Sequence, residues 1–179
     1  MKIKKENVAL LVIDMQDKIL QAINSKENLI KKCEILIKGC QALDIPIIVT
    51  EQYKKGLGNT ASSIAELFNV NPIEKFEFSC LENTEIKAKL ESLGKRYIIV
   101  IGIEAHVCVQ QTVLDLMDED FKPIVIADCI SSRNEYDKKF AIKRIRDYGA
   151  DVTTLEAILF EMLVTSKSPE FKTISLLVK

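Results

Sequence analysis

The sequence predicts an α/β fold, a three-layer α/β/α sandwich with a mainly parallel, Rossmann-like sheet. Short apolar runs rich in β-branched residues, such as YIIVI at residues 97–101, are typical of strands buried on both faces. Segments with apolar residues at helical spacing alternate with these runs along the chain. Because right-handed crossovers join strand, helix and strand, this alternation indicates a parallel sheet covered by helices on both sides.

The elements follow one another in regular order. Strands are expected near residues 8–13, 47–50, 97–101, 124–127 and 151–153. Helices are expected near residues 28–42, 62–68, 84–93, 107–120, 135–148 and 154–163, with a final amphipathic helix over 168–178. Pro169 suits the first turn of that last helix, where no backbone N–H is needed. The long irregular stretch 51–72 follows a strand, a common place for a substrate-binding loop.

Composition limits the classes of function. The chain has 179 residues, 47% of them apolar, and 25 basic and 26 acidic residues give a net charge of −1. This suits one domain over residues 1–179 with a substantial core. The mixed charge gives no reason to expect nucleic acid or an anionic membrane as partner. No apolar run approaches the roughly 20 residues that span a bilayer, and we expect no secretion signal.

Cysteine and histidine usage indicates the compartment and argues against a metal. An odd number of widely spaced cysteines argues against a disulfide framework and predicts a cytoplasmic location. The single histidine excludes a multi-histidine metal site, so we expect no metal and no cofactor. Helical spacing over 28–42 favours core packing for two of the five thiols, Cys33 and Cys40. The five are Cys33, Cys40, Cys80, Cys108 and Cys129.

Three residues predict a reactive centre. Cys108 comes after the strand at 97–101, near the first turn of a helix, where free N–H groups and the helix dipole favour a thiolate. A buried structural cysteine is the alternative. Asp14 ends the strand at 8–13, and functional groups of parallel sheets gather at the carboxyl ends of the strands. With Lys75, these residues supply a nucleophile, a base and a stabilising charge.

Six segments, in order and at similar spacing, resemble the isochorismatase-like cysteine hydrolases from end to end. They are LVIDMQD at 11–17, TEQYKKGLG at 50–58, EKFEFS at 74–79, GIEAHVCV at 102–109, DCISSR at 128–133 and GADVTTLE at 149–156. The resemblance implies a catalytic triad of Asp14, Lys75 and Cys108. It also implies a homo-oligomer, a dimer or larger, acting on a small molecule.

The resemblance assigns roles to further residues. The peptide before Glu104 should be cis, and the backbone N–H groups of Glu104 and Cys108 should form an oxyanion hole. The substrate pocket should include Gln16, Gln52, Tyr53 and His106. His106 lies only two residues before the cysteine, a spacing that does not bring helical side chains together, so packing is favoured over a base role.

Alternative functions are distinguished by what these segments contain. The nicotinamidase branch carries zinc-binding histidines at the position of residues 51–53, and this chain has none there. Isochorismatases that cleave a vinyl ether do not need the cysteine, so the resemblance favours hydrolysis of an amide C–N bond without a metal. A flavodoxin-like cofactor binder is disfavoured, because residues 14–17 hold two acids and no glycine. A nicotinamidase-type amidase and an inactive binding or regulatory protein on the same fold stay as alternatives.

Overall fold

A parallel sheet of six strands forms the centre of the protein. The computed structural model describes residues 3–179. The strands are β1 (Val8–Ile13), β2 (Ile47–Gln52), β3 (Ile73–Lys75), β4 (Tyr97–Ile103), β5 (Lys122–Ser131) and β6 (Asp151–Thr153). They lie in the order β3-β2-β1-β4-β5-β6, and every neighbouring pair is parallel. The predicted α/β fold class is confirmed.

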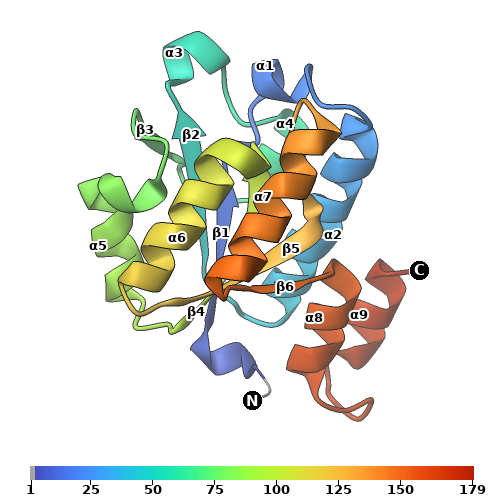
Figure 1. The fold of residues 1–179 in the computed structure, drawn as a ribbon. Coiled ribbons are helices and arrows are strands. Elements are labelled where there is room, and N and C mark those ends of the chain that lie inside the picture. The colour runs from blue at the N-terminus through green and yellow to red at the C-terminus, as the bar shows by residue number, and fades with distance from the viewer. Residues whose placement is uncertain (1–2) are drawn as a thin grey trace.

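Helices cover both faces of the sheet and make it a three-layer structure (Figure 1). The helices α2, α8 and α9 pack on one face, and α5, α6 and α7 pack on the other. The helical elements are η1 (Lys5–Asn7), α1 (Asp17–Leu20), α2 (Lys26–Ala42), α3 (Lys54–Leu57), α4 (Ser62–Ala65), η2 (Cys80–Glu82), α5 (Thr84–Ser92), η3 (Ala105–Val109), α6 (Gln110–Asp118), α7 (Glu135–Tyr148), α8 (Leu155–Leu163) and α9 (Phe171–Leu177).

The central strands divide the core into two halves. Successive side chains of a strand point to opposite faces. In β1, Leu10 and Val12 therefore pack with the core under α2 and α8, whereas Leu11 and Ile13 pack with the core under α5 and α6. Both sets are fully buried. This explains why the strand is continuously apolar rather than alternating.

The strand order reverses between β1 and β4, and the backbones there approach closely. Gly102 has a φ of 120°, and a Cβ atom at this position would lie 2.0 Å from the carbonyl oxygen of Ile13. Only glycine fits such a contact. The carboxyl ends of β1 and β4 therefore lie side by side at the switch point, which is where ligands bind in open α/β sheets.

Several predicted boundaries need correction. Strand β3 and the four-residue helices α1 and α3 were not predicted, because at least half of the residues in each are charged and they show no apolar pattern. The helix expected over 107–120 is instead a π-helical turn, η3, followed by α6. The last helix begins at Phe171, so Pro169 precedes it. Within residues 3–179, every helix is too short or too polar to span a bilayer.

Candidate active site

Asp14 and Lys75 form a buried ion pair at the carboxyl edge of the sheet. Asp14 follows β1 with a φ of 51° and is fully buried, as is Lys75 at the end of β3. The Lys75 Nζ atom donates a hydrogen bond of 2.7 Å to Asp14 Oδ2. The hydroxyl of Thr50, on β2 between them, donates to Asp14 Oδ1 at 2.7 Å. Each carboxylate oxygen therefore has its own donor.

The remaining contacts of Lys75 keep its ammonium charged. Its Nζ atom donates to Gln52 Oε1 at 2.6 Å and to the carbonyl oxygens of Glu77 and Phe78 at 3.1 and 3.2 Å. Burial alone would lower the pKa of Lys75, but the charge of Asp14 and the hydrogen bond to it outweigh burial, so the pKa is raised. The short β3 strand and the turn after it thus fix a cation inside the protein.

Cys108 completes this group from η3, just after β4. Only 7% of the residue is exposed. Burial raises the pKa of its thiol well above the ordinary value; the charge of Asp14 raises it further, and the charge of Lys75 partly offsets both. The sequence-based prediction of an easily ionised thiol is therefore wrong for this site, because burial outweighs the helix start. The raised pKa keeps the resting thiol protonated, close to the charges of Asp14 and Lys75.

A cavity of about 300 Å³ opens above Cys108. This lies at the lower end of the range for small-molecule sites, about 300–1,000 Å³. Most of its wall is apolar, with three charged side chains. The wall consists of Lys18, Ile19, Ala22, Gln52, Leu57, Phe78, Glu104, Val107, Cys108 and Arg133. Sequence reasoning missed Lys18, Phe78 and Arg133, although the last two lie within the segments that resemble the family.

Only one of the four residues expected in the pocket lines this cavity, namely Gln52. The side chain of Gln16 is fully buried and holds two loops together: it accepts from the Gln52 backbone N–H and donates to the carbonyl oxygens of Gln52 and Gly58. The ring of Tyr53 is half-exposed and packs against Phe76, 5.9 Å between centroids.

His106 does not line the cavity, and its ring contacts the segment after β5. Its Nδ1 atom lies 2.9 Å from the hydroxyl oxygen of Ser132, at the end of β5. That His106 packs and is not a general base stays a prediction. The side chain ties η3 to the segment that follows β5.

Glu104 lines the cavity. The Ile103–Glu104 peptide is cis, as the resemblance predicts. The Glu104 carboxylate accepts hydrogen bonds from the backbone N–H of Arg133 at 3.0 Å and from its Nε–H at 3.1 Å. The pair joins the turn after β4 to the turn after β5, the two turns that flank the thiol.

In the segment at residues 51–53, the carboxylate of Glu51 is paired with polar groups from nearby residues. The buried carboxylate of Glu51 accepts from the backbone N–H and hydroxyl of Thr60, at 2.7 and 2.9 Å, and forms an ion pair with Lys54. Burial raises the pKa of Glu51, but these hydrogen bonds outweigh it and the pKa is lowered. Among residues 3–179, no three or more His, Cys, Asp or Glu side chains come together in a way that could hold a metal.

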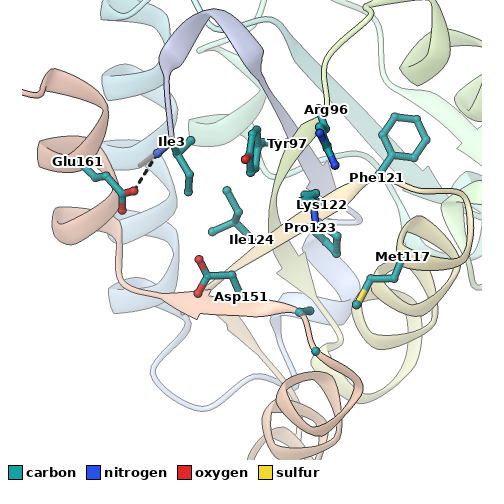
Figure 2. Close-up of a pocket in the computed structure, with 12 residues that line it drawn as sticks. Ile3, Arg96, Tyr97, Met117, Phe121, Lys122, Pro123, Ile124, Asp151 and Glu161 are labelled. Atoms are coloured by element: carbon teal, nitrogen blue, oxygen red, sulfur yellow. Dashed lines mark hydrogen bonds between the residues drawn. The ribbon is translucent and has the colours of Figure 1, made fainter. Parts of the chain in front are cut away.

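A second hollow, of about 470 Å³, lies at the opposite edge of the sheet. Figure 2 shows it at the starts of β4, β5 and β6, with Tyr97, Lys122 and Asp151 around it. There the Glu161 carboxylate points toward the N-terminal segment and accepts from the Ile3 N–H at 2.9 Å. Although larger than the cavity above Cys108, it lies at the amino ends of the strands, where parallel sheets seldom place chemistry.

Comparison with known proteins identifies the family. Residues 8–157 match the isochorismatase domain. A Salmo salar protein, isochorismatase domain-containing protein 1, is 37% identical over 166 residues, which cover 93% of this chain and 59% of that protein. A Danio rerio protein, isochorismatase domain-containing protein 2, is 33% identical over 97% of this chain and 87% of its own length. The chain therefore belongs to the isochorismatase family, and it spans little more than half of the Salmo salar relative.

Solved structures share the fold. A Caenorhabditis elegans protein described as MAR1 ribonuclease superposes with a TM-score of 0.93 and 37% identity, covering 99% of this chain and 92% of that chain. The Escherichia coli YcaC gene product, described as an octameric hydrolase of unknown specificity, superposes with a TM-score of 0.94 over 99% of this chain and 89% of that chain. At 20% identity, the second match shows the fold alone. The three-layer arrangement is thus a hydrolase fold of the isochorismatase family.

Proposed function

We propose that the protein is a metal-independent cysteine hydrolase that cleaves an amide C–N bond of a small molecule. The observation that supports this most strongly is the fully buried ion pair of Asp14 and Lys75, whose charges both act on the Cys108 thiol, a thiol that lines a small cavity. A purely structural cysteine needs neither a carboxylate nor a buried cation beside it.

In the first half-reaction the Cys108 sulfur attacks the carbonyl carbon of the substrate. Because the resting thiol is neutral, its proton passes to the Asp14 carboxylate as the C–S bond forms. The negative charge moves to the carbonyl oxygen, which accepts hydrogen bonds from the backbone N–H groups of Glu104 and Cys108. The C–N bond then breaks, and the leaving nitrogen takes the proton from Asp14.

In the second half-reaction water attacks the thioester. Asp14 accepts a proton from that water, the C–S bond breaks, and the proton returns to the sulfur as the acid product leaves. Lys75 stays charged throughout and stabilises the carboxylate while the sulfur carries negative charge. The raised pKa of the thiol fits this cycle, since a neutral thiol delivers the proton that the leaving nitrogen requires.

A screen of purified protein against small amides tests the proposal. The panel includes nicotinamide, because a nicotinamidase-type amidase is the alternative enzyme, and a short RNA, because the Caenorhabditis elegans relative is described as a ribonuclease. We expect ammonia or amine release from at least one small amide, unchanged by EDTA, and no RNA cleavage.

The control is Cys108→Ala in the same screen. Amide turnover that survives this substitution would contradict the nucleophile assignment. Loss of turnover in EDTA with recovery in zinc would contradict metal independence. Absence of turnover, with binding of a small molecule retained in both proteins, would favour the inactive binding protein.

We also propose a cytoplasmic location, supported by the chemistry of the cysteines. All five are free and buried, which suits a reducing compartment. Cell fractionation with an antibody against the protein tests this, and recovery from a secreted or oxidising compartment would contradict it.

A further inference from the structure

The charged groups around the cavity do not balance. Its wall carries two cations, Lys18 and Arg133, and one acid, Glu104. Glu104 is committed to Arg133 through two hydrogen bonds to one carboxylate oxygen. Outside the wall, the charge of buried Asp14 is balanced by Lys75. One positive charge, that of Lys18, is therefore left without an acidic partner in the cavity wall.

Lys18 is held over the cavity by a contact that leaves its charge intact. It lies on α1, and its Nζ atom donates a hydrogen bond of 2.8 Å to the carbonyl oxygen of Gly56 on α3. Figure 1 shows α1 and α3 at the end of the sheet opposite the N-terminus, above the carboxyl ends of the strands. A carbonyl oxygen occupies one of the three donors of an ammonium, so two remain for a ligand.

The rest of the wall favours a short apolar spacer. Ile19, Ala22, Leu57, Phe78 and Val107 share the wall with the thiol and the charged side chains. A ligand that fills about 300 Å³ therefore meets a nucleophile, hydrocarbon and a cation within one cavity.

We propose that the cavity selects small carbonyl compounds that carry a carboxylate remote from the bond attacked, and that Lys18 recognises this carboxylate. The inference rests on the proposed function of Cys108 and adds the substrate class, a short-chain monoamide of a dicarboxylic acid. One uncompensated positive charge matches the single charge of a carboxylate, whereas a phosphate dianion would leave an excess negative charge.

The test compares two reagents of similar size that react with the same thiol, iodoacetate and iodoacetamide. Rates of Cys108 alkylation are measured by peptide mapping in the wild type, Lys18→Gln, Lys18→Arg and Lys55→Gln. Lys55 is an exposed lysine of α3 outside the cavity wall and serves as the matched control. The ratio of the iodoacetate rate to the iodoacetamide rate reports how well the site accepts an anion, independently of turnover.

We expect the ratio to fall about fivefold in Lys18→Gln, as for loss of one partly exposed ionic contact. It should be retained in Lys18→Arg and in Lys55→Gln. A ratio in Lys18→Gln equal to that of the wild type, or an equal fall in Lys55→Gln, would overturn the assignment of Lys18.

Turnover separates failure of this inference from failure of the proposed function. Succinamate and butyramide differ by a carboxylate in place of a methyl group. If both are hydrolysed without a preference for succinamate, the hydrolase proposal survives and the carboxylate inference falls. If neither is hydrolysed while the alkylation ratio still depends on Lys18, the anion site stands and the hydrolase proposal loses its support.

Discussion

At the scale of single residues, Thr50 holds the side of the Asp14 carboxylate that Lys75 does not reach. The two oxygens of Asp14 have separate donors, each at 2.7 Å. A carboxylate fixed from two directions has one orientation toward the thiol, which is what proton transfer at hydrogen-bonding distance requires. Thr50 is therefore a positioning residue that acts through Asp14.

Thr50→Val should slow amide turnover roughly tenfold or more, because it removes a hydrogen bond to a charged group. Thr50→Ser keeps the hydroxyl and should restore most of the rate. Thr60→Val is the matched control, since the Thr60 hydroxyl donates to a neighbouring buried acid, Glu51, outside the proposed triad. The measurement is kcat with unfolding temperature, and an equal loss of kcat in both valine variants would contradict the role of Thr50.

The Cys108 thiol should be the first of the five to react, and its reaction should have an unusual pH dependence. Cys108 lines a cavity, whereas the other four are fully buried. Because its pKa is raised, the thiolate fraction keeps growing as pH rises through the ordinary value of 9.0. Iodoacetamide labelling with peptide mapping should show a rate at Cys108 that still increases above that pH, and a plateau below it would contradict the burial argument.

The sequence alone predicts the main residues of the site but not their electrostatics. Asp14 and Cys108 could be placed together because both follow buried parallel strands. The raised pKa of the thiol could not be predicted, since it arises from burial under elements far away in the chain. Lys18 was missed because nothing local to α1 shows that the helix closes over Cys108.

At the scale of secondary-structure elements, the contact between β1 and β4 holds the site together. Gly102 pairs with Ile13 across the two strands, directly before Asp14 on one strand and close to Cys108 on the other. Any side chain on Gly102 would separate the strand ends that carry the base and the nucleophile.

Gly102→Ala should destabilise the protein by about 3 kcal/mol, because its Cβ would overlap the Ile13 carbonyl and neither backbone can yield without breaking the sheet. Gly94→Ala also places alanine at a positive φ, 60°, but into open space. It should cost about 1 kcal/mol. Urea unfolding of both variants measures the difference, and equal losses would show that the steric contact at Gly102 is unimportant.

Elements with a clear apolar pattern or clear terminal signals were predictable, whatever their length. The spans of β1, β6 and α7 agree with those expected from the sequence, because each shows a clear apolar pattern or clear terminal signals. Strand β3 has three residues, two of them charged, and exists because it pairs with the end of β2. Its position fixes Lys75, so a central part of the site depends on tertiary context.

At the scale of the whole molecule, the described surface leaves aromatic side chains in water. Tyr136 and Phe140 on α7 are both exposed and lie 4.6 Å apart between ring centroids. The last helix, α9, was expected to cover either the core or a partner subunit, and its Ile174 is buried within the chain. Exposed apolar groups that cluster are typical of surfaces that bind another protein.

The protein should therefore form a homo-oligomer, as its resemblance to the family predicts. Multi-angle light scattering should give a mass at least twice that of the 20.2 kDa chain. The measured mass should stay the same when the protein is diluted through the micromolar range. A mass of one chain at every concentration would contradict the prediction.

The central claim is that Asp14, Lys75 and Cys108 act together electrostatically, and the ionisation of Cys108 in two variants tests it most directly. Asp14 raises the pKa of the thiol and Lys75 lowers it. At a pH below the pKa of a thiol, the thiolate fraction falls about tenfold when that pKa rises by about one.

Alkylation of Cys108 at fixed pH should therefore be faster in Asp14→Asn and slower in Lys75→Met than in the wild type, while both variants lose amide turnover. Circular dichroism confirms that each is folded, since unpairing a buried ion costs about 3–5 kcal/mol. Unchanged alkylation in both folded variants, or rate changes in the same direction, would contradict the account.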